Sequence, residues 1–423
     1  MRSWPAPPVP SLPPLEQTLE IHSTPAGTTV PVTSPRGLAS LYVCGITPYD
    51  ATHLGHANTY VQFDLLVRYW RACGLDVNYV QNVTDIDDPL LERAEATGTD
   101  WRELAESQTE LFRSDMEALR VIPPTTYMGA VEMIPGVVED VEKLAELGIA
   151  YQVPAEDAEG PDYYFDIAAA EDRTDWRLGS IGGYERPAME ELFPERGGDP
   201  DRPGKRDPLD PLLWRARRRG EPHWDGRSLG EGRPGWHIEC SVIARRHLPA
   251  PFTVQGGGSD LRFPHHEFSA AHATAADETP LAEHYVHTGM VGLDGEKMSK
   301  SLRNLVLVSQ LTAAGNDPQA IRALLLSHHW RTDWSFTADE LAAAETRLGR
   351  WKQALAEAPE DAGDAGRPSE LQYSLMSALA GDLNAPAALD ILDLWADGHF
   401  ARGTSGTQAR DVVDALLGLD LGV

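Results

Sequence analysis

The chain has 423 residues and a formal net charge of −29 at pH 7. This length allows two or three domains, and a hydrophobic fraction of 42% with a charged fraction of 24% is typical of a globular protein. Because so acidic a chain is a poor match for a long polyanion, we expect no nucleic-acid partner. No stretch approaches 18 consecutive apolar residues, so we expect no membrane span.

Residues 1–35 are expected to form a proline-rich N-terminal arm. The opening sequence MRSWPAPPVPSLPPLE lacks the apolar core of a secretory signal. We therefore expect an arm that lies on the surface or is poorly ordered.

Residues 36–153 alternate strand and helix signals. The stretch LYVCGITPYDATHLGHANTY, residues 41–60, begins as a short buried strand. A helical period follows from about Thr59 to Ala72, and DVNYVQNV then reads as the next strand. A second amphipathic helix ends at Gly148. This rhythm predicts an α/β fold with a parallel sheet covered by helices, of which this segment is the first half.

Three further segments differ in composition. Residues 154–235 are dense in Pro, Gly, Asp and Arg, which predicts an irregular insertion with a few short strands. Residues 236–320 are expected to return the chain to the sheet and to complete this α/β domain. Helical patterns dominate residues 321–423, where Thr337 and Glu340 have the spacing of a capping box. We expect a C-terminal helical bundle there.

The cysteines are few: Cys44, Cys73 and Cys240. A sparse, odd set indicates a reducing cytoplasm rather than a disulfide framework. Cys44, Cys240 and His265 are ligand types that zinc prefers, but their spacing is not that of a zinc finger. On residue types alone, buried apolar packing is the commoner role of such cysteines.

Two histidines, His53 and His56, stand at the head of the first predicted helix, on either side of Gly55. The free N–H groups at a helix N-terminus beside a strand end favour an anion, and imidazoles there could donate hydrogen bonds to phosphate. The pattern is neither a P-loop nor G-x-G-x-x-G. When H-x-x-H stands alone, two histidines that cap a helix are the commoner explanation.

A second stretch, GEKMSKSLRN at 295–304, places Lys297 and Lys300 in a glycine-led loop. Alone it could be a solvated turn. Together with HLGH, it resembles the paired signature of class I aminoacyl-tRNA synthetases. The resemblance implies a Rossmann-like catalytic domain, ATP with Mg²⁺, and adenylate chemistry in which His53, His56, Lys297 and Lys300 stabilise the reacting phosphate.

Five segments, LYVCG, NVTDIDD, RPGWHIECS, FPHHE and KMSKS, occur in one order that resembles cysteinyl-tRNA synthetase across about residues 35–310. The resemblance implies that Cys44, Cys240 and His265 hold one zinc ion, which binds the substrate thiol. A Zn–S bond of about 2.3 Å is available to cysteine and not usefully to serine. Ligand chemistry would then select the amino acid, where pocket shape supplies only ~1–3 kcal/mol.

The sequence departs from the synthetase at three points. Ser269, in HHEFS, stands where that enzyme has a glutamate as fourth zinc ligand; the part after the lysine motif is short; and the chain is acidic. All three resemble the mycothiol-biosynthesis ligases, which also carry HLGH, HHEFSAAHA and an ERGGDP segment, here Glu195–Pro200. This resemblance implies an ATP-dependent ligase that forms cysteinyl-AMP and transfers the cysteinyl group to the amine of glucosaminyl-inositol, releasing AMP and pyrophosphate.

By position in the family's motifs, a further set of residues is expected to line the adenylate pocket. They are Cys44, Gly45, Ile46, Thr47, Thr59, Asn82, Val83, Thr84, Trp236, Gly258, Ser259, Asp260 and Val291. Alternatives remain for several: Trp236 could be core, and Gly258–Asp260 could be only a turn. Asp85, Asp87 and Asp88 in TDIDD fit a cap and loop network better than a Mg²⁺ site.

Two rival functions stay open, a reduced cysteinyl-tRNA synthetase and a non-catalytic binding protein. The run RARRRG, with Arg215–Arg219, is typical of a solvated face but could screen pyrophosphate or the sugar. No motif identifies the residues that bind the acceptor. We expect a monomer.

Overall fold

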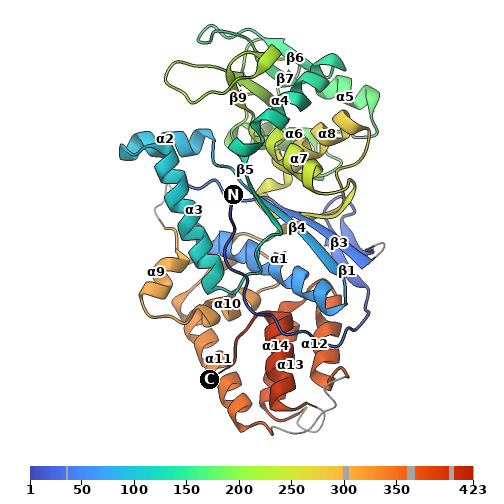
Figure 1. Ribbon diagram of the computed structural model, residues 1–423, viewed down its shortest axis with the longest axis vertical. Coiled ribbons are helices and arrows are strands. Elements are labelled where there is room, and N and C mark those ends of the chain that lie inside the picture. The colour runs from blue at the N-terminus through green and yellow to red at the C-terminus, as the bar shows by residue number, and fades with distance from the viewer. Residues whose placement is uncertain (35–36, 299–303, 360–366, 400–403, 423) are drawn as a thin grey trace.

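The computed structural model describes residues 1–423 except 35–36, 299–303, 360–366, 400–403 and 423. Figure 1 shows three levels along the long axis: an upper lobe of short strands and helices, a central sheet with its helices, and a lower group of helices. None of the helices within the described ranges is both long and apolar enough to cross a bilayer.

The central sheet has five strands in the order β11-β10-β3-β4-β5, and all neighbours pair in parallel. This arrangement confirms the predicted fold class. The order reverses between β3 and β10, and in such sheets ligands bind where the carboxyl ends of the strands diverge. The strands are β3 (Leu38–Val43), β4 (Asp76–Val83), β5 (Thr126–Gly129), β10 (Phe252–Gly258) and β11 (Ala282–Thr288).

Helix α1 (Leu54–Ala72) begins five residues before the predicted start at Thr59, because His53 caps it. Its flanks pack on the sheet and on C-terminal helices, so most of its residues are buried, polar ones included. The other helices of the catalytic part are α2 (Asp88–Thr97), α3 (Trp101–Ala118), α4 (Ala130–Glu146), α7 (Trp236–His247) and α8 (His265–Asp277).

The insertion is more regular than predicted. Its three strands join β6, which ends just before residue 154, in one antiparallel sheet in sequence order, over a core that includes Phe165, Phe193 and Trp214. Because each strand has only three to five residues between Pro- and Gly-rich loops, no alternation was visible in the sequence. The elements are β6 (Ala150–Val153), β7 (Asp162–Phe165), α5 (Ile167–Arg173), α6 (Arg186–Glu195), β8 (Leu212–Ala216), η2 (Arg227–Leu229) and β9 (Gly232–Pro234).

The N-terminal arm is anchored rather than poorly ordered. Trp4 is 3% exposed, its indole N–H donates to the Val121 carbonyl at 2.7 Å, and its ring lies edge-on to Phe112 and Tyr127. The arm continues into a hairpin of β1 (Leu19–Ser23) and β2 (Thr28–Val32). A single buried aromatic residue thus fixes a segment whose composition alone suggested freedom.

The C-terminal part is helical, as predicted, and α11 begins with the expected capping box of Thr337 and Glu340. A small sheet of β12, β13 and β14 precedes it. The elements are β12 (Val291–Leu293), β13 (Glu296–Lys297), α9 (Val308–Ala313), α10 (Pro318–Leu326), β14 (Trp334–Phe336), α11 (Ala338–Glu357), α12 (Glu370–Ala380), α13 (Ala385–Ala396) and α14 (Gly406–Leu417).

A buried ion cluster joins the helices below the sheet. Asp64 of α1 accepts from Arg68 at 2.7 Å and from Arg322 of α10. Burial opposes ionisation of Asp64, but the two guanidinium groups outweigh it and keep its pKa below the usual value. Arg322 also donates to the carbonyls of Leu417 and Leu119, at 2.7 and 2.8 Å. One carboxylate therefore ties α1, α10 and the end of α14 together.

Replacing Asp64 with asparagine should lower the free energy of unfolding by about 3–5 kcal/mol, because two buried guanidinium groups lose their counter-charge. Urea denaturation measures this change. Asp76→Asn, at the exposed first residue of β4, is the matched control and should stay within about 0.5 kcal/mol of the parent. Equal effects of the two substitutions would contradict the role given to the cluster.

Candidate active site

The carboxyl edge of the sheet brings together three residues that are distant in sequence. Cys44 directly follows β3, and its backbone N–H donates to Gly256 of β10 at 3.1 Å. Cys240 lies in α7 and His265 is the first residue of α8. All three are buried, and one ligand atom from each lies within 4.8 Å of the other two. Within the described residues, this is the sole group of three or more Cys, His, Asp or Glu with that spacing.

The chemistry of this Cys-Cys-His group suits a soft divalent metal. The Sγ atoms of Cys44 and Cys240 are 3.9 Å apart, so the two are not joined by a disulfide. Burial raises the pKa of Cys44. Burial also opposes ionisation of Cys240, but its contacts with Cys44 and His265 outweigh this and hold its pKa well below the usual value. Two sulfur atoms and one imidazole nitrogen form a donor set typical of zinc.

Ser269 does not complete the group. Its hydroxyl donates to the backbone carbonyl of His265 at 2.6 Å, one helical turn back, and lies 3.2 Å from the carbonyl of His237. Serine is a poor zinc ligand and this hydroxyl is engaged with backbone, which leaves three protein donors. A three-donor site with a fourth, open position is the arrangement that lets a metal bind a substrate atom.

Further side chains surround the three donors. His266 Nε2 lies 3.2 Å from Cys44 Sγ, and His237 Nδ1 lies 3.1 Å from His265 Nδ1. Burial lowers the pKa of both His237 and His266 well below the usual value, so both rings are neutral. His287 continues the contacts to His266 at 2.8 Å. Such outer partners fix the orientation of metal ligands.

The sequence analysis singled out neither His237 nor His287. His237 stands within the motif RPGWHIECS, so a signal for it was present. His287, in β11, belongs to no motif, and only the pairing of β11 with β10 reveals it.

Trp236 stacks on His265, with ring centroids 4.4 Å apart and an interplanar angle of 27°. The indole is only partly buried, unlike a plain core residue. The indole therefore covers one face of the His265 ring and keeps some access to solvent.

The histidines of HLGH begin α1 at the same edge. His53 Nδ1 accepts from the backbone N–H groups of Gly55 at 3.1 Å and His56 at 3.4 Å, so the capping interpretation is correct for His53. This contact assigns the ring hydrogen to Nε2, which is the donor atom a phosphate needs. The His53 and His56 rings stack with centroids 3.7 Å apart. Capping and phosphate binding are thus compatible roles.

The predicted adenylate residues after β3 and β4 lie side by side. Asn82 Oδ1 accepts from the backbone N–H of Gly45 at 2.8 Å, and Thr84 N–H donates to the carbonyl of Ile46 at 3.0 Å. A Cβ on Gly45 would lie 1.6 Å from the Asn82 carbonyl oxygen, so only glycine fits there. Thr47 continues the first segment and Val83 ends β4.

Three other parts of the predicted pocket close the edge. Thr59 Oγ1 of α1 lies 2.9 Å from Thr288 Oγ1, at the end of β11. Gly258 ends β10, and Ser259 and Asp260 begin the 3₁₀ turn η3 (Ser259–Arg262), with the Asp260 side chain exposed. Val291 begins β12.

The lysine motif is described only in part. The backbone of Lys297 pairs with Gly292 in the β12–β13 hairpin, whereas Lys300 lies outside the described residues. The chain beyond the motif returns to the HLGH helix: Leu54 N–H donates to the Val306 carbonyl at 2.9 Å, and Val308 N–H to the Thr52 carbonyl at 3.0 Å. Backbone hydrogen bonds therefore hold the segment just after the lysine motif against the start of the HLGH helix.

The aspartates of TDIDD serve as caps and ties. Asp87 caps α2, Asp85 accepts from the Val131 N–H at 2.9 Å, and Asp88 pairs with Arg233 of β9. The cap-and-loop interpretation of this segment is correct.

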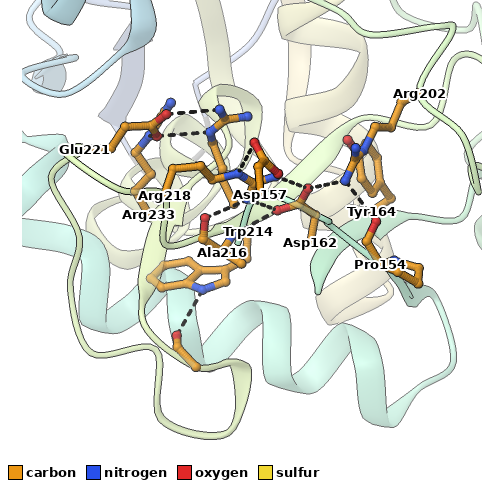
Figure 2. Close-up of polar contacts among 12 residues, drawn as sticks. Pro154, Asp157, Asp162, Tyr164, Arg202, Trp214, Ala216, Arg218, Glu221 and Arg233 are labelled. Carbon is orange, nitrogen blue, oxygen red and sulfur yellow. Dashed lines mark hydrogen bonds and ion pairs between the residues drawn. The ribbon is translucent and has the colours of Figure 1, made fainter. Parts of the chain in front are cut away.

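Three arginines of the run form ion pairs with carboxylates elsewhere in the insertion. Figure 2 shows Arg218 against Asp162, with bonds of 2.5 and 2.8 Å. Arg215 pairs with Glu221, and Arg217 with Glu231. The pairs of Arg215 and Arg218 tie segments of the insertion together, whereas the pair of Arg217 with Glu231 is exposed.

Comparisons with known proteins agree with this geometry. The family described as "tRNA synthetases class I (C) catalytic domain" matches residues 31–346. A relative from Micrococcus luteus, named L-cysteine:1D-myo-inositol 2-amino-2-deoxy-alpha-D-glucopyranoside ligase, is 60% identical over 427 residues and covers 100% of both chains. A ligase of the same name from Kocuria rhizophila is 56% identical over 444 residues, again with 100% of both chains covered.

Solved structures of low identity share the fold. Methionyl-tRNA synthetase of Mycobacterium tuberculosis, in complex with methionyl-adenylate, is 16% identical with a TM-score of 0.59, over 90% of this chain and 88% of that one. A leucyl-tRNA synthetase complex of Agrobacterium radiobacter is 12% identical with a TM-score of 0.63, over 92% and 84%. The chain belongs to the L-cysteine:1D-myo-inositol 2-amino-2-deoxy-alpha-D-glucopyranoside ligase family and has the class I aminoacyl-tRNA synthetase fold.

Proposed function

We propose that the chain is an ATP-dependent ligase that activates L-cysteine as cysteinyl-AMP and transfers it to the amine of glucosaminyl-inositol. The observation that carries the proposal is the buried group of Cys44, Cys240 and His265 at the point where the strand order of the sheet reverses. A donor set for a metal that binds sulfur thus lies at the same sheet edge as the HLGH helix, where this type of fold binds nucleotides.

The first step forms the mixed anhydride. A carboxylate oxygen of cysteine attacks the α-phosphorus of ATP, the bond to the bridging oxygen breaks, and pyrophosphate leaves with Mg²⁺. His53 donates from Nε2, and His56, Lys297 and Lys300 supply further hydrogen bonds and positive charge. These groups lower the barrier because they match charge that grows on the phosphate oxygens.

The second step forms the amide. The neutral amine nitrogen of glucosaminyl-inositol attacks the carbonyl carbon of cysteinyl-AMP, loses its proton, and AMP leaves. A mixed anhydride is already reactive toward a free amine, so the protein contributes mainly by holding the two reactants together.

We assign Cys44, Cys240 and His265 as the ligands of one zinc ion per chain. When bound, zinc supplies a soft Lewis acid that favours the thiolate form of a sulfur ligand. His237 and His266 hold His265 and Cys44 in orientation, and Trp236 covers one face of the imidazole. Selection by sulfur would exclude serine.

The setting follows from composition. Three unpaired cysteines suit a reducing cytoplasm, and a net charge of −29 suits small-molecule substrates better than tRNA. We propose a monomer without a nucleic-acid partner.

A direct assay supplies the chain with cysteine, ATP and either glucosaminyl-inositol or cysteine tRNA. We expect cysteine-dependent ATP–pyrophosphate exchange and a product with the mass of the amide. Charging of tRNA without amide formation would instead identify a cysteinyl-tRNA synthetase, and absence of exchange would favour a non-catalytic binding protein.

Cys240→Ser should lose bound zinc and cysteine activation while the chain stays folded, because serine is a poor zinc ligand. Metal content by elemental analysis and pyrophosphate exchange measure the two losses. Cys73→Ser is the control: Cys73 ends α1, away from the Cys-Cys-His group, and should keep both properties. Full zinc content and activity in Cys240→Ser would remove Cys240 from the metal site.

Lys300→Ala should slow cysteinyl-AMP formation about 100-fold, because one cationic contact to the reacting phosphate is lost. Cysteine affinity should change little. Single-turnover adenylation and calorimetric titration with cysteine separate these quantities. Lys352→Ala, in a surface pair with Asp317, is the control. An unchanged adenylation rate in Lys300→Ala would contradict its role.

A further inference from the structure

The segment ERGGDP, residues 195–200, has no part in the mechanism above. It follows α6 in the insertion, yet its arginine reaches the catalytic domain. Arg196 Nη1 donates to the backbone carbonyl of Asp260 at 2.6 Å and to that of Phe263. Asp260 belongs to η3, and Phe263 directly follows that turn.

The rest of the motif fixes the origin of this contact. Gly197 has a positive φ of 87°, which favours glycine. A Cβ on Gly198 would lie 2.4 Å from the Phe193 ring, so a larger residue would push the turn away from α6. Asp199 accepts from Lys205 Nζ at 3.0 Å and from the Tyr164 hydroxyl. Each residue from 196 to 199 therefore has a geometric role in this turn.

The Arg196 side chain binds backbone carbonyls rather than a carboxylate. Within the described residues, Arg196 makes no ion pair with a carboxylate, and its recorded hydrogen bonds all go to the two carbonyls of the η3 region. Hydrogen bonds from a charged donor are stronger than neutral ones. The guanidinium is thus committed to holding the backbone of one turn.

That turn links the two halves of the site. On one side is β10, whose end leads to Asp260; on the other is α8, which begins with His265. Other contacts already secure the α8 side: Glu267 accepts from the Gly182 N–H at 2.7 Å, and Arg262 Nη2 donates to the Gly182 carbonyl at 2.6 Å. Among the described arginines of the insertion, only Arg196 donates a hydrogen bond to the Asp260 backbone.

We propose that Arg196 is a positioning residue for the nucleotide: by gripping the carbonyls of Asp260 and Phe263, it holds the exposed Asp260 carboxylate toward the ribose hydroxyls of ATP. The turn formed by the ERGGDP motif fixes the position of this arginine. This inference rests on the proposed function of the site, because it takes Asp260 as the ribose contact.

The test replaces Arg196 with methionine, which keeps an unbranched side chain but has no donor. The KM for ATP in pyrophosphate exchange should rise about 10-fold, as expected for loss of a charge-assisted hydrogen bond. The KM for cysteine, the zinc content and kcat should stay within about 2-fold. Because one nitrogen serves both carbonyls, the ammonium of Arg196→Lys should restore part of the loss. Arg217→Met, in an exposed pair with Glu231, is the control and should match the parent.

An unchanged KM for ATP in folded Arg196→Met would overturn the proposal. So would parallel rises of both KM values with loss of zinc, because they indicate general support of the fold. If Arg196→Met does not fold, Arg196→Lys decides: its ATP parameters must lie measurably above those of the parent, and equality overturns the proposal. Calorimetric titration with ATP alone keeps the test independent of catalysis, so a parent without exchange activity would refute the proposed function and leave this comparison valid.

Discussion

Cys44, Cys240 and His265 can meet only because β3 lies directly beside β10. The strands come from opposite halves of the catalytic domain, and the pairing carries on past β3, since the N–H of Cys44 itself donates to Gly256. Helices α7 and α8 flank β10 in the chain, so the same pairing delivers Cys240 and His265. The site thus depends on one line of parallel hydrogen bonds at the reversal of strand order.

The insertion is part of this arrangement rather than an appendage. Its last strand, β9, ends at Pro234, and α7 begins at Trp236 after a single glycine. A Cβ on Gly235 would lie 2.0 Å from the Leu212 carbonyl oxygen, so the insertion sheet and α7 are in close contact. Arg233 forms ion pairs with both Asp88 and Glu221, which ties the insertion to the start of α2. Movement of the insertion would therefore displace Cys240.

The sequence predicted what depends on local patterns. The β-α rhythm predicted the parallel sheet, and the spacing of Thr337 and Glu340 predicted the start of α11. Motif order suggested Cys44, Cys240 and His265, although their spacing alone did not. The rest depends on tertiary partners that no local pattern encodes. Trp4 fixes the arm only because Val121 offers a carbonyl, and the insertion strands become a sheet only through pairing. Likewise, His287 reaches the site through the neighbouring strand β10.

The backbone hydrogen bonds between residues 52–54 and 306–308 couple substitutions at these positions to the catalytic residues. Leu54, Val306 and Val308 carry no charge and no catalytic group. Their backbone hydrogen bonds nevertheless hold the start of the histidine helix against the segment that follows the lysines. A proline at Val308 would remove the N–H that bonds the Thr52 carbonyl, and it would misalign the histidines and the lysines together. Defects that map to these aliphatic positions would mimic the loss of a catalytic cation.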